Sequence, residues 1–301
     1  MALKNVSFKN EFDSSGAVTL LDIIKWQFSK KRILSKAFSS LEMKKESSLL
    51  SSKEDFICWL GHASFLVQLG QKRFLFDPVF GNVPFYKRKF PTPYSVEELG
   101  KIDYVLISHV HYDHFDKPSL KALLHKNVEF ILPLGMQSYI KQIDKNATIH
   151  SLDWYESYRV EGLKLSFVPS KHWGRRGAFD TNKSLWGGFV LELKNQSIYF
   201  AGDTAYDQHF KEIGERYNID HALLPIGAYD PIEVMKHNHT NPQEAYEAFK
   251  DLNAKQMLPM HYGTFKLTDE PINEPAEWLD RLVEEHGEDI YKSKVGEVWF
   301  I

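Results

Sequence analysis

The chain has 301 residues, a formal net charge of −3 at pH 7 and 43% hydrophobic residues, which suffices for a sizeable core and excludes a globally basic surface that would bind nucleic acid. Cys58 is the only cysteine, so an intramolecular disulfide framework is excluded and a reducing compartment is expected. Because no signal-peptide core and no membrane-spanning stretch is found, we expect a cytoplasmic protein, with peripheral binding at the inner membrane face as an alternative.

Residues 1–52 differ from the rest and are predicted to form an N-terminal amphipathic helical extension and a linker. In Thr19–Phe38 apolar residues recur with roughly helical spacing beside several lysines and one arginine. Such a helix either packs its apolar face on the main domain, as single amphipathic helices usually do, or lies on an anionic membrane surface. The serine- and lysine-rich stretch Lys44–Lys53 is the predicted linker, and residues 53–301 are the predicted main domain.

The main domain is predicted to begin with a β-hairpin. The apolar runs Phe56–Leu69 and Arg73–Phe76 are joined at Gly70-Gln71-Lys72, which is a turn signal. His62 lies in a polar interruption of the first run and is either a substrate contact near the functional site or a hydrogen-bonded core histidine. The next loop, Phe80–Tyr94, combines aromatic residues, prolines and a Lys-Arg-Lys triplet. It either lines an apolar substrate groove or touches lipid headgroups, or it is an ordinary surface loop with its aromatic residues turned inward.

A short buried strand, Tyr104–Ile107, leads directly into a run of metal-binding side chains. Within six residues the sequence contains His109, His111, Asp113 and His114. A strand end is a rigid support from which a loop can direct several side chains to one point. Imidazole nitrogen and carboxylate oxygen are ligands that zinc prefers, and four such donors exceed what a single tetrahedral catalytic site accommodates. The run therefore predicts two adjacent metals.

Helices and strands are then expected to alternate along the chain. The predicted helices are Lys117–His125, Ser138–Lys145, Phe210–Tyr217, Pro242–Leu252 and Pro275–His286. The predicted strands are Val128–Pro133, Thr148–Leu152, Leu163–Pro169, Ser184–Leu193, Ser197–Phe200, His221–Ile226, Gln256–Met260 and Glu297–Phe300. This order predicts layered α/β packing around one shared site.

Three further donors, each just past the end of a predicted strand, complete a set of seven metal ligands: His172, Asp203 and His261. The expected ligands of the first metal are three histidines: His109, His111 and His172. The expected ligands of the second metal are Asp113, His114 and His261. Asp203 is expected to bridge the two metals.

The run of donors resembles the His-x-His-x-Asp-His signature of the metallo-β-lactamase fold. Further motifs resemble the branch of that fold that contains N-acylphosphatidylethanolamine-hydrolysing phospholipase D, over about residues 55–270. These motifs are Trp59-Leu-Gly-His-Ala-Ser, Phe76-Asp-Pro-Val-Phe, Trp173-Gly-Arg-Arg, Phe200-Ala-Gly-Asp-Thr-Ala-Tyr, Pro225-Ile-Gly-Ala-Tyr-Asp-Pro, Met235-Lys-His-Asn-His-Thr-Asn-Pro-Gln-Glu-Ala and His261-Tyr-Gly-Thr-Phe.

The resemblance implies an αββα sandwich with two Zn²⁺ ions per chain, Mn²⁺ or Fe²⁺ being the alternatives. It implies a phospholipase D-like phosphodiesterase in which a metal-bridging hydroxide attacks a phospholipid or another phosphodiester. Asp113 is expected to hold the proton of the hydroxide, and His239 is expected to contact the substrate phosphate. From residue chemistry alone, His237 and His239 could equally be surface histidines.

Two other functions fit the same residues. A lactonase or a cyclic-nucleotide phosphodiesterase would use the same dinuclear site, because one fold supports many chemistries. A catalytically silent, membrane-peripheral metal-binding protein would use the basic N-terminal helix instead. A missing ligand would favour this last function, and the sequence lacks none of the seven.

Overall fold

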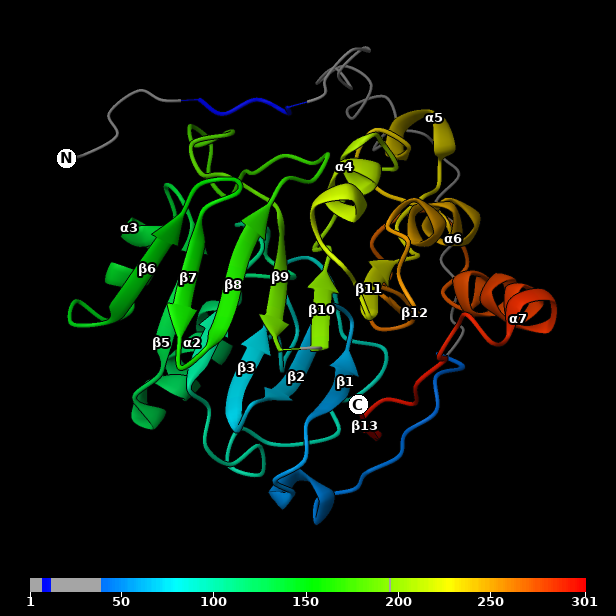
Figure 1. Cartoon of the computed structure of the whole chain (residues 1–301). Coiled ribbons are helices and arrows are strands. Elements are labelled where there is room, and N and C mark those ends of the chain that lie inside the picture. The colour runs from blue at the N-terminus through cyan, green and yellow to red at the C-terminus, as the bar shows by residue number, and fades with distance from the viewer. Residues whose placement is uncertain (1–6, 12–38, 195) are drawn as a thin grey trace.

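The computed structural model describes residues 7–11, 39–194 and 196–301, and Figure 1 shows its two β-sheets and the helices around them. The predicted amphipathic helix Thr19–Phe38 lies outside the described residues. None of the helices in the described ranges is long and apolar enough to cross a membrane.

The first sheet contains seven strands in the order β13-β1-β2-β3-β4-β5-β6. These strands are β1 (Phe56–Gly61), β2 (Ser64–Leu69), β3 (Lys72–Phe76), β4 (Tyr104–Leu106), β5 (Glu129–Pro133), β6 (Thr148–Leu152) and β13 (Val298–Phe300). β13 and the first three strands pair antiparallel, whereas β4, β5 and β6 extend the sheet in parallel. The last two parallel connections run through α2 (Lys117–Leu123), η2 (Leu124–Lys126) and α3 (Gln137–Lys141), as parallel pairing requires a crossover.

The second sheet contains six strands in the order β12-β11-β10-β9-β8-β7. They are β7 (Ser157–Val160), β8 (Leu163–Val168), β9 (Gly188–Leu193), β10 (Gln196–Phe200), β11 (His221–Pro225) and β12 (Gln256–Met260). The remaining helices are η1 (Leu49–Ser51), α4 (His209–Arg216), α5 (Ile232–Met235), α6 (Pro242–Asp251) and α7 (Glu274–His286). β7 to β10 are antiparallel, and β10 to β12 are parallel.

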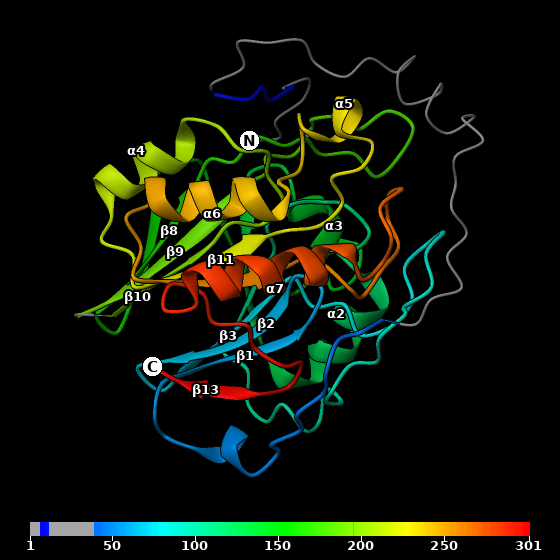
Figure 2. The same ribbon diagram turned by 90° about the vertical axis from the view of Figure 1, so that its right-hand side faces the viewer.

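Side chains alternate between two cores along each strand of the first sheet. In β1, Ile57 and Trp59 belong to the core shared with the second sheet, whereas Phe56 and Cys58 belong to a second core that includes residues of α2 and α3. The first core also extends to α4 and α6, which lie over the second sheet in Figure 2, and to α7. Helices therefore cover both outer faces, and the architecture is the predicted αββα sandwich.

Several predicted boundaries differ from the observed ones for identifiable reasons. β7 was not predicted, because it is a short edge strand whose residues are exposed or half-buried. The strand expected at Ser184–Leu193 begins only at Gly188. The first residues of the predicted strand instead form hydrogen bonds with loops of the first sheet. The Leu185 amide, for example, donates to the Leu134 carbonyl at 2.8 Å. The predicted helix Pro242–Leu252 is observed as α6, and the Asn241 side chain caps it by accepting from the Glu244 amide in a capping box.

The predicted linker lies against the domain. Leu50 is buried, and the Lys44 amide donates to the Val295 carbonyl at 2.9 Å. The Tyr94 hydroxyl accepts from the Glu46 amide. The described residues 39–52 thus pack on residues of the main domain, and a domain boundary at residue 53 stays a prediction.

Candidate active site

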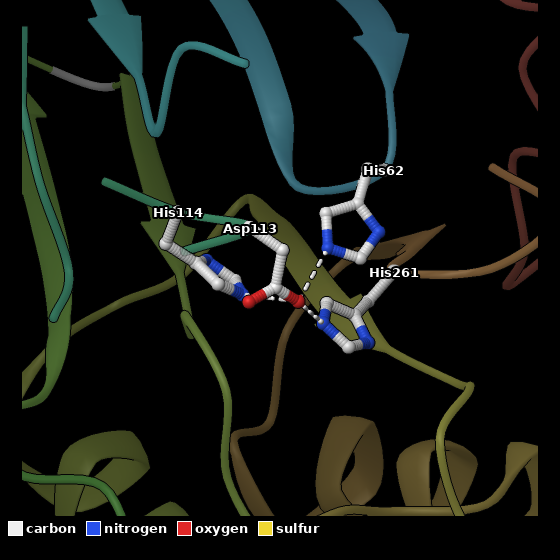
Figure 3. A group of neighbouring side chains, drawn as sticks. All are labelled: His62, Asp113, His114 and His261. Atoms are coloured by element: carbon white, nitrogen blue, oxygen red, sulfur yellow. Dashed lines mark hydrogen bonds and ion pairs between the residues drawn. The ribbon is translucent and has the colours of Figure 1, made fainter. Parts of the chain in front are cut away.

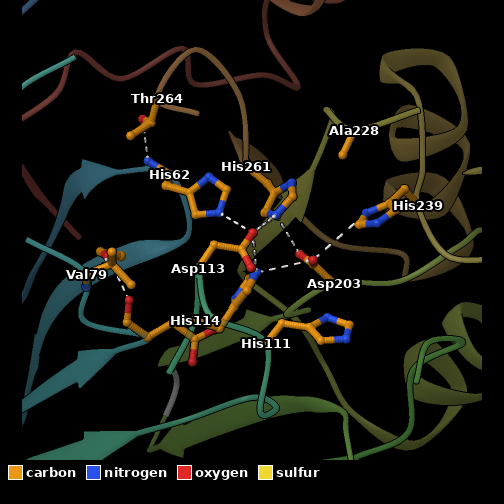
Figure 4. A network of polar contacts seen from close by, with 12 residues as sticks. His62, Val79, His111, Asp113, His114, Asp203, Ala228, His239, His261 and Thr264 are labelled. Atoms are coloured by element: carbon orange, nitrogen blue, oxygen red, sulfur yellow. Dashed lines mark hydrogen bonds and ion pairs between the residues drawn. The ribbon is translucent and has the colours of Figure 1, made fainter. Parts of the chain in front are cut away.

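The predicted metal ligands lie together on loops that follow strands, and Figure 4 shows His111, Asp113, His114, Asp203 and His261 among them. The loop after β4 carries His109, His111, Asp113 and His114. Single residues follow β8, β10 and β12, namely His172, Asp203 and His261. His62 lies between β1 and β2, and His239 lies between α5 and α6. The ends of strands from both sheets therefore supply one constellation, as the sequence predicted.

Three imidazole nitrogens converge in the first group. His111 Nδ1 lies 2.9 Å from His109 Nε2 and 3.1 Å from His172 Nε2. Burial lowers the pKa of all three histidines, that of His111 to about 4. The three rings are therefore neutral, which is the state that binds a metal.

The outer nitrogens of this group fix which ring nitrogen carries the proton. His172 Nδ1 lies 3.0 Å from the Asn238 carbonyl, which can only accept. The Ser108 hydroxyl donates to Asp77, so it accepts from His109 Nδ1 at 2.9 Å. Both neutral rings must then present unprotonated Nε2 atoms to His111, which can donate to only one of them. The three facing nitrogens thus carry at most one proton between them, so a cation bound at their centre fits the arrangement.

A second group surrounds the Asp113 carboxylate (Figure 3). Asp113 Oδ2 lies 3.0 Å from His62 Nε2, 3.6 Å from His261 Nε2 and 3.7 Å from His114 Nε2. The four side chains are close enough to hold one metal ion. The structure thus brings His62 to the predicted second metal site, and its assignment as a substrate contact stays a prediction.

Asp203 lies between the two groups. Its carboxylate oxygens lie 3.2 Å from His114 Nε2 and 3.1 Å from His261 Nε2 in the second group. Asp203 Oδ2 is also 4.0 Å from His109 Nε2 and 3.9 Å from His172 Nε2 in the first. This position is the one expected of a carboxylate that bridges two metals.

The second group favours positive charge. Burial alone would lower the pKa of His114, but Asp203 and Asp113 outweigh burial and raise it well above its ordinary value. Burial would likewise raise the pKa of Asp203, but His114 and His261 hold it well below its usual range. Two ionised carboxylates thus face imidazoles in a buried site, and divalent metals would supply the compensating charge.

Four residues around these groups have left-handed backbone conformations. The φ angles are 54° at His62, 38° at Asp77, 66° at Ala228 and 63° at His261. Such conformations are rare for residues with a side chain and persist only where the surroundings hold them. Here the His261 amide donates to the His62 carbonyl at 3.0 Å, and the His62 amide donates to Thr264 Oγ1 at 2.9 Å.

Asp77 is a part of the site that the sequence analysis did not assign. It is fully buried. Asp77 Oδ1 accepts from the Ser108 amide at 2.7 Å, and Oδ2 accepts from His114 Nδ1 at 2.6 Å and from Ser108 Oγ at 2.5 Å. Asp77 therefore holds the proton of His114 on Nδ1 and directs Nε2, the nitrogen that would bind a metal, at Asp203, a role that outer carboxylates often have for metal-binding histidines.

We expect Asp77→Asn to weaken metal binding by about 10- to 100-fold. The side-chain amide of asparagine has two possible orientations. In one, its NH₂ group faces the Ser108 amide, so that a donor faces a donor. In the other, its NH₂ group faces His114 Nδ1 and moves the ring proton to Nε2. The affinity is measured by competition with a chelator. Asp103→Asn is the matched control, because Asp103 also accepts a backbone amide at a strand end, that of Arg73 at 2.9 Å, but lies outside the site. Equal affinities of Asp77→Asn and Asp103→Asn would contradict this role.

Arg176 holds the loop that carries the histidine run. Its guanidinium donates to the carbonyls of Val110 and Phe115 at 3.0 and 2.7 Å and lies 4.0 Å from the centre of the Tyr112 ring. The Tyr112 hydroxyl in turn donates to the Arg176 carbonyl. Both ends of the donor-bearing loop are thereby fixed from a distant segment.

A pocket of about 320 Å³ opens onto the two groups. Its polar residues include His111, Asp113, Asp203 and His239. Its apolar wall includes Val83, Phe85, Tyr112, Trp173, Met235 and Leu267. Part of the aromatic loop Phe80–Tyr94 therefore lines a pocket, as one of its predicted roles requires.

His239 enters this pocket, whereas His237 is not among the residues that line it. His239 Nδ1 lies 3.9 Å from Asp203 Oδ2, and burial lowers the pKa of His239 to about 4. The ring is therefore neutral and carries one N–H donor. Asp203, His239 and His261 are also near enough to hold a metal, so the geometry permits either a ligand or a substrate contact at His239.

Comparisons with known proteins match most of the chain and its fold. The profile of the β-lactamase superfamily domain matches residues 72–262. The chain is 35% identical over 268 residues to N-acyl-phosphatidylethanolamine-hydrolyzing phospholipase D 1 of Caenorhabditis elegans, covering 81% of this chain and 75% of that protein. It is 38% identical over 240 residues to the mitochondrial enzyme of the same name from Saccharomyces cerevisiae, covering 75% of this chain but 51% of the yeast protein. A metallo hydrolase from Ignicoccus hospitalis has a similar fold, with a TM-score of 0.65, 23% identity and coverage of 83% and 99% of the two chains.

Proposed function

Because the chain belongs to the β-lactamase superfamily, in the branch of the N-acylphosphatidylethanolamine-hydrolysing phospholipase D-like proteins, we propose that it hydrolyses a phosphodiester. The chain is a metal-dependent hydrolase, and the leading substrate that we propose is an N-acyl phospholipid. The observation that carries this proposal is one pocket with a polar floor of metal-binding side chains and an apolar wall. Such a pocket suits a substrate in which a phosphate adjoins apolar chains.

The donor groups fit two divalent metals, and their histidine-rich chemistry favours zinc. His109, His111 and His172 would hold the first metal. Asp113, His114 and His261 would hold the second, with His62 beside them and Asp203 shared by both. When bound, the metals would lower the pKa of water toward neutrality and stabilise negative charge on the phosphoryl oxygens.

Asp113 would act on the proton of the attacking water. Its carboxylate lines the pocket, and only one of its oxygens, Oδ2, faces His62 Nε2 at 3.0 Å. A carboxylate that binds a metal through one oxygen can accept a hydrogen bond with the other. Asp113 would thereby orient the water toward the phosphorus atom and retain its proton until the leaving alkoxide takes it up.

His239 would donate its single N–H to the phosphate. The neutral ring lies at the boundary of the polar floor and the apolar wall, 3.9 Å from Asp203. A donor placed there would stabilise the charge that grows on a phosphoryl oxygen during attack. The wall formed by Trp173, Tyr112 and Met235 would bury the adjoining apolar part of the substrate and exclude bulk water.

Hydrolysis in oxygen-18 water tests the reaction. Attack at phosphorus predicts label in the phosphate-containing product, and label in the alcohol would contradict it. A panel of N-acyl phosphatidylethanolamine, cyclic AMP and an acyl lactone tests the substrate class. We expect turnover of the first, because cyclic AMP has no apolar chain for the wall. Turnover of the lactone or of cyclic AMP alone would favour the corresponding alternative activity.

Peripheral membrane contact would bring the pocket to such a substrate. Phe85, a residue of the pocket wall, is 94% exposed, and Ile232 on the adjacent α5 is 52% exposed. Lys87 and Lys89 are exposed on the same loop as Phe85. An exposed aromatic residue beside cations suits an anionic lipid surface.

We expect Phe85→Ser to weaken binding to phosphatidylglycerol-containing vesicles by about tenfold, since burial of a phenylalanine side chain contributes roughly 1.5–3 kcal/mol. Vesicle sedimentation measures the change. Phe300→Ser is the matched control, because Phe300 is also exposed but lies on β13 and does not line the pocket. Equal loss of binding in both variants, or in neither, would contradict contact through the pocket rim.

A further inference from the structure

A short N-terminal segment, residues 7–11, lies on the same side of the molecule as the loops of the site. Figure 1 shows it crossing the end of the second sheet, far in sequence from the loops beneath it. We refer to residues 7–11 as the N-terminal strap. It lies outside residues 72–262, which match the superfamily profile, and neither the sequence nor the proposed reaction assigns it a role.

The strap is attached at Phe8. The Phe8 amide donates to the Asn182 carbonyl at 2.8 Å, and its side chain packs against the core between the sheets. Asn182 is itself bound to Gly174: its amide donates to the Gly174 carbonyl at 2.6 Å, and its side chain accepts from the Gly174 amide at 3.1 Å. Phe8 therefore supports, through Asn182, a residue two positions after His172.

Asn10 reaches His172 directly. Asn10 Oδ1 accepts from the His172 amide at 3.1 Å and from Trp186 Nε1 at 3.0 Å. His172 and Trp186 are both buried, and buried N–H groups require acceptors. Trp186 Nε1 has a second acceptor, the Ser170 carbonyl at 3.1 Å. Among the described residues no second acceptor is found for the His172 amide, so Asn10 alone satisfies it there.

The segment 172–174, which Asn10 and Asn182 hold by hydrogen bonds, contributes two side chains to the site. His172 directs Nε2 at His111, 3.1 Å away, within the first metal group. The ring of Trp173 lies edge-on to that of His111, with centroids 4.6 Å apart, and lines the pocket. Asn10 from one side and Asn182 from the other thus hold a ligand position and a wall residue in place.

We propose that Asn10 is a positioning residue through which the N-terminal strap holds His172 in the position that binds the first metal. The proposal rests on the proposed function in one respect, namely that His172 is a metal ligand. Loss of the acceptor at Asn10 would leave the His172 amide without a partner and free the ring to leave the position that faces His111. The first metal, held by His109, His111 and His172, would then bind more weakly than the second.

The test is metal retention in the full-length protein during titration with a chelator. We expect Asn10→Ala to release one zinc ion per chain at a roughly tenfold lower chelator concentration, the lower end of the effect of removing an outer hydrogen bond. Asn10→Asp keeps an acceptor oxygen and should restore most of the retention. Lys9→Ala, an exposed neighbour on the same strap, is the control and should match the unmodified protein. Cobalt substitution adds a spectroscopic readout, because the visible bands report the geometry of the first site.

The metal-free protein provides a second, independent readout. We expect the His172 amide to exchange with solvent faster in Asn10→Ala than in Lys9→Ala, as measured by NMR. Unchanged metal retention in Asn10→Ala would overturn the proposal, even if its melting temperature falls, because a purely structural role would then suffice. If the unmodified protein binds no metal, the proposed function fails, whereas the amide exchange still shows whether Asn10 holds His172.

Discussion

Asp203→Asn is expected to reduce phosphodiester hydrolysis by about 10³-fold, which corresponds to about 4 kcal/mol of transition-state stabilisation. The Asp203 carboxylate approaches imidazoles of both groups, with oxygens 3.1–3.2 Å from His261 and His114 and 3.9 Å from His172. An amide retains the volume but loses the charge and one of the two acceptor oxygens. Both metals should therefore bind more weakly, and the buried imidazoles should lose the anion that compensates the metal charge.

Metal content and steady-state rate, measured on the same preparation, check this result. Asp220→Asn is the matched control, because Asp220 is a half-buried carboxylate that binds Ser197 and Lys255 away from the site. This control should keep both metals and its rate. Full activity in Asp203→Asn, or an equal loss in Asp220→Asn, would contradict the bridging role.

His239→Ala is expected to lower kcat by about 10²- to 10³-fold without loss of metal, as removal of a donor to a developing negative charge does in other hydrolases. His239 projects into the pocket from the loop between α5 and α6, whereas the seven predicted ligands lie on loops that follow strands. The variant should keep the metal stoichiometry of the unmodified protein.

His237→Ala is the control for this prediction, since the same chemical change is made two residues away at a position that does not line the pocket. Its kcat should be unchanged. If His239→Ala instead releases a metal ion at a low chelator concentration, His239 is a ligand in the group with Asp203 and His261. The substrate contact would then have to be reassigned.

The ligand constellation could be predicted because every donor follows a strand. Apolar runs such as Tyr104–Ile107 and Gln256–Met260 have a clear strand signature, and in layered α/β folds strand ends gather at one edge. The seven predicted ligands accordingly lie together in the structure, with Asp203 between the two groups. Their roles as ligands are tested by the metal measurements above.

The supporting residues could not be predicted in the same way. Asp77 and His114 are separated by 37 positions, and Asn10 and His172 by 162. A single carboxylate at a strand end, or an asparagine in a polar N-terminal stretch, has no periodicity that would indicate its partner. Asp77 does lie within the motif Phe76-Asp-Pro-Val-Phe, and its place in this motif was the one signal in the sequence that could have indicated its role.

Gly202 shows how closely the two sheets must approach to build the site. Its φ angle is 64°, and a Cβ atom there would lie 2.8 Å from the Ser108 side chain and 2.9 Å from the Gly187 carbonyl. The absence of a side chain therefore lets the end of β10 lie against the loop after β4. Asp203 directly follows Gly202, and His109 directly follows Ser108. The contact between Gly202 and Ser108 therefore sets the distance between the Asp203 carboxylate and the first group.

The metal content of the purified protein, measured by mass spectrometry beside its activity on bis-p-nitrophenyl phosphate, shows whether the site is a dinuclear hydrolytic centre. We predict two metal ions per chain after a chelator-free preparation, loss of phosphodiesterase activity on their removal, and its return when zinc is added. One metal ion or none in the active protein, or activity that survives complete removal of metal, would contradict a dinuclear site formed by His109, His111, His172, Asp113, His114, His261 and Asp203.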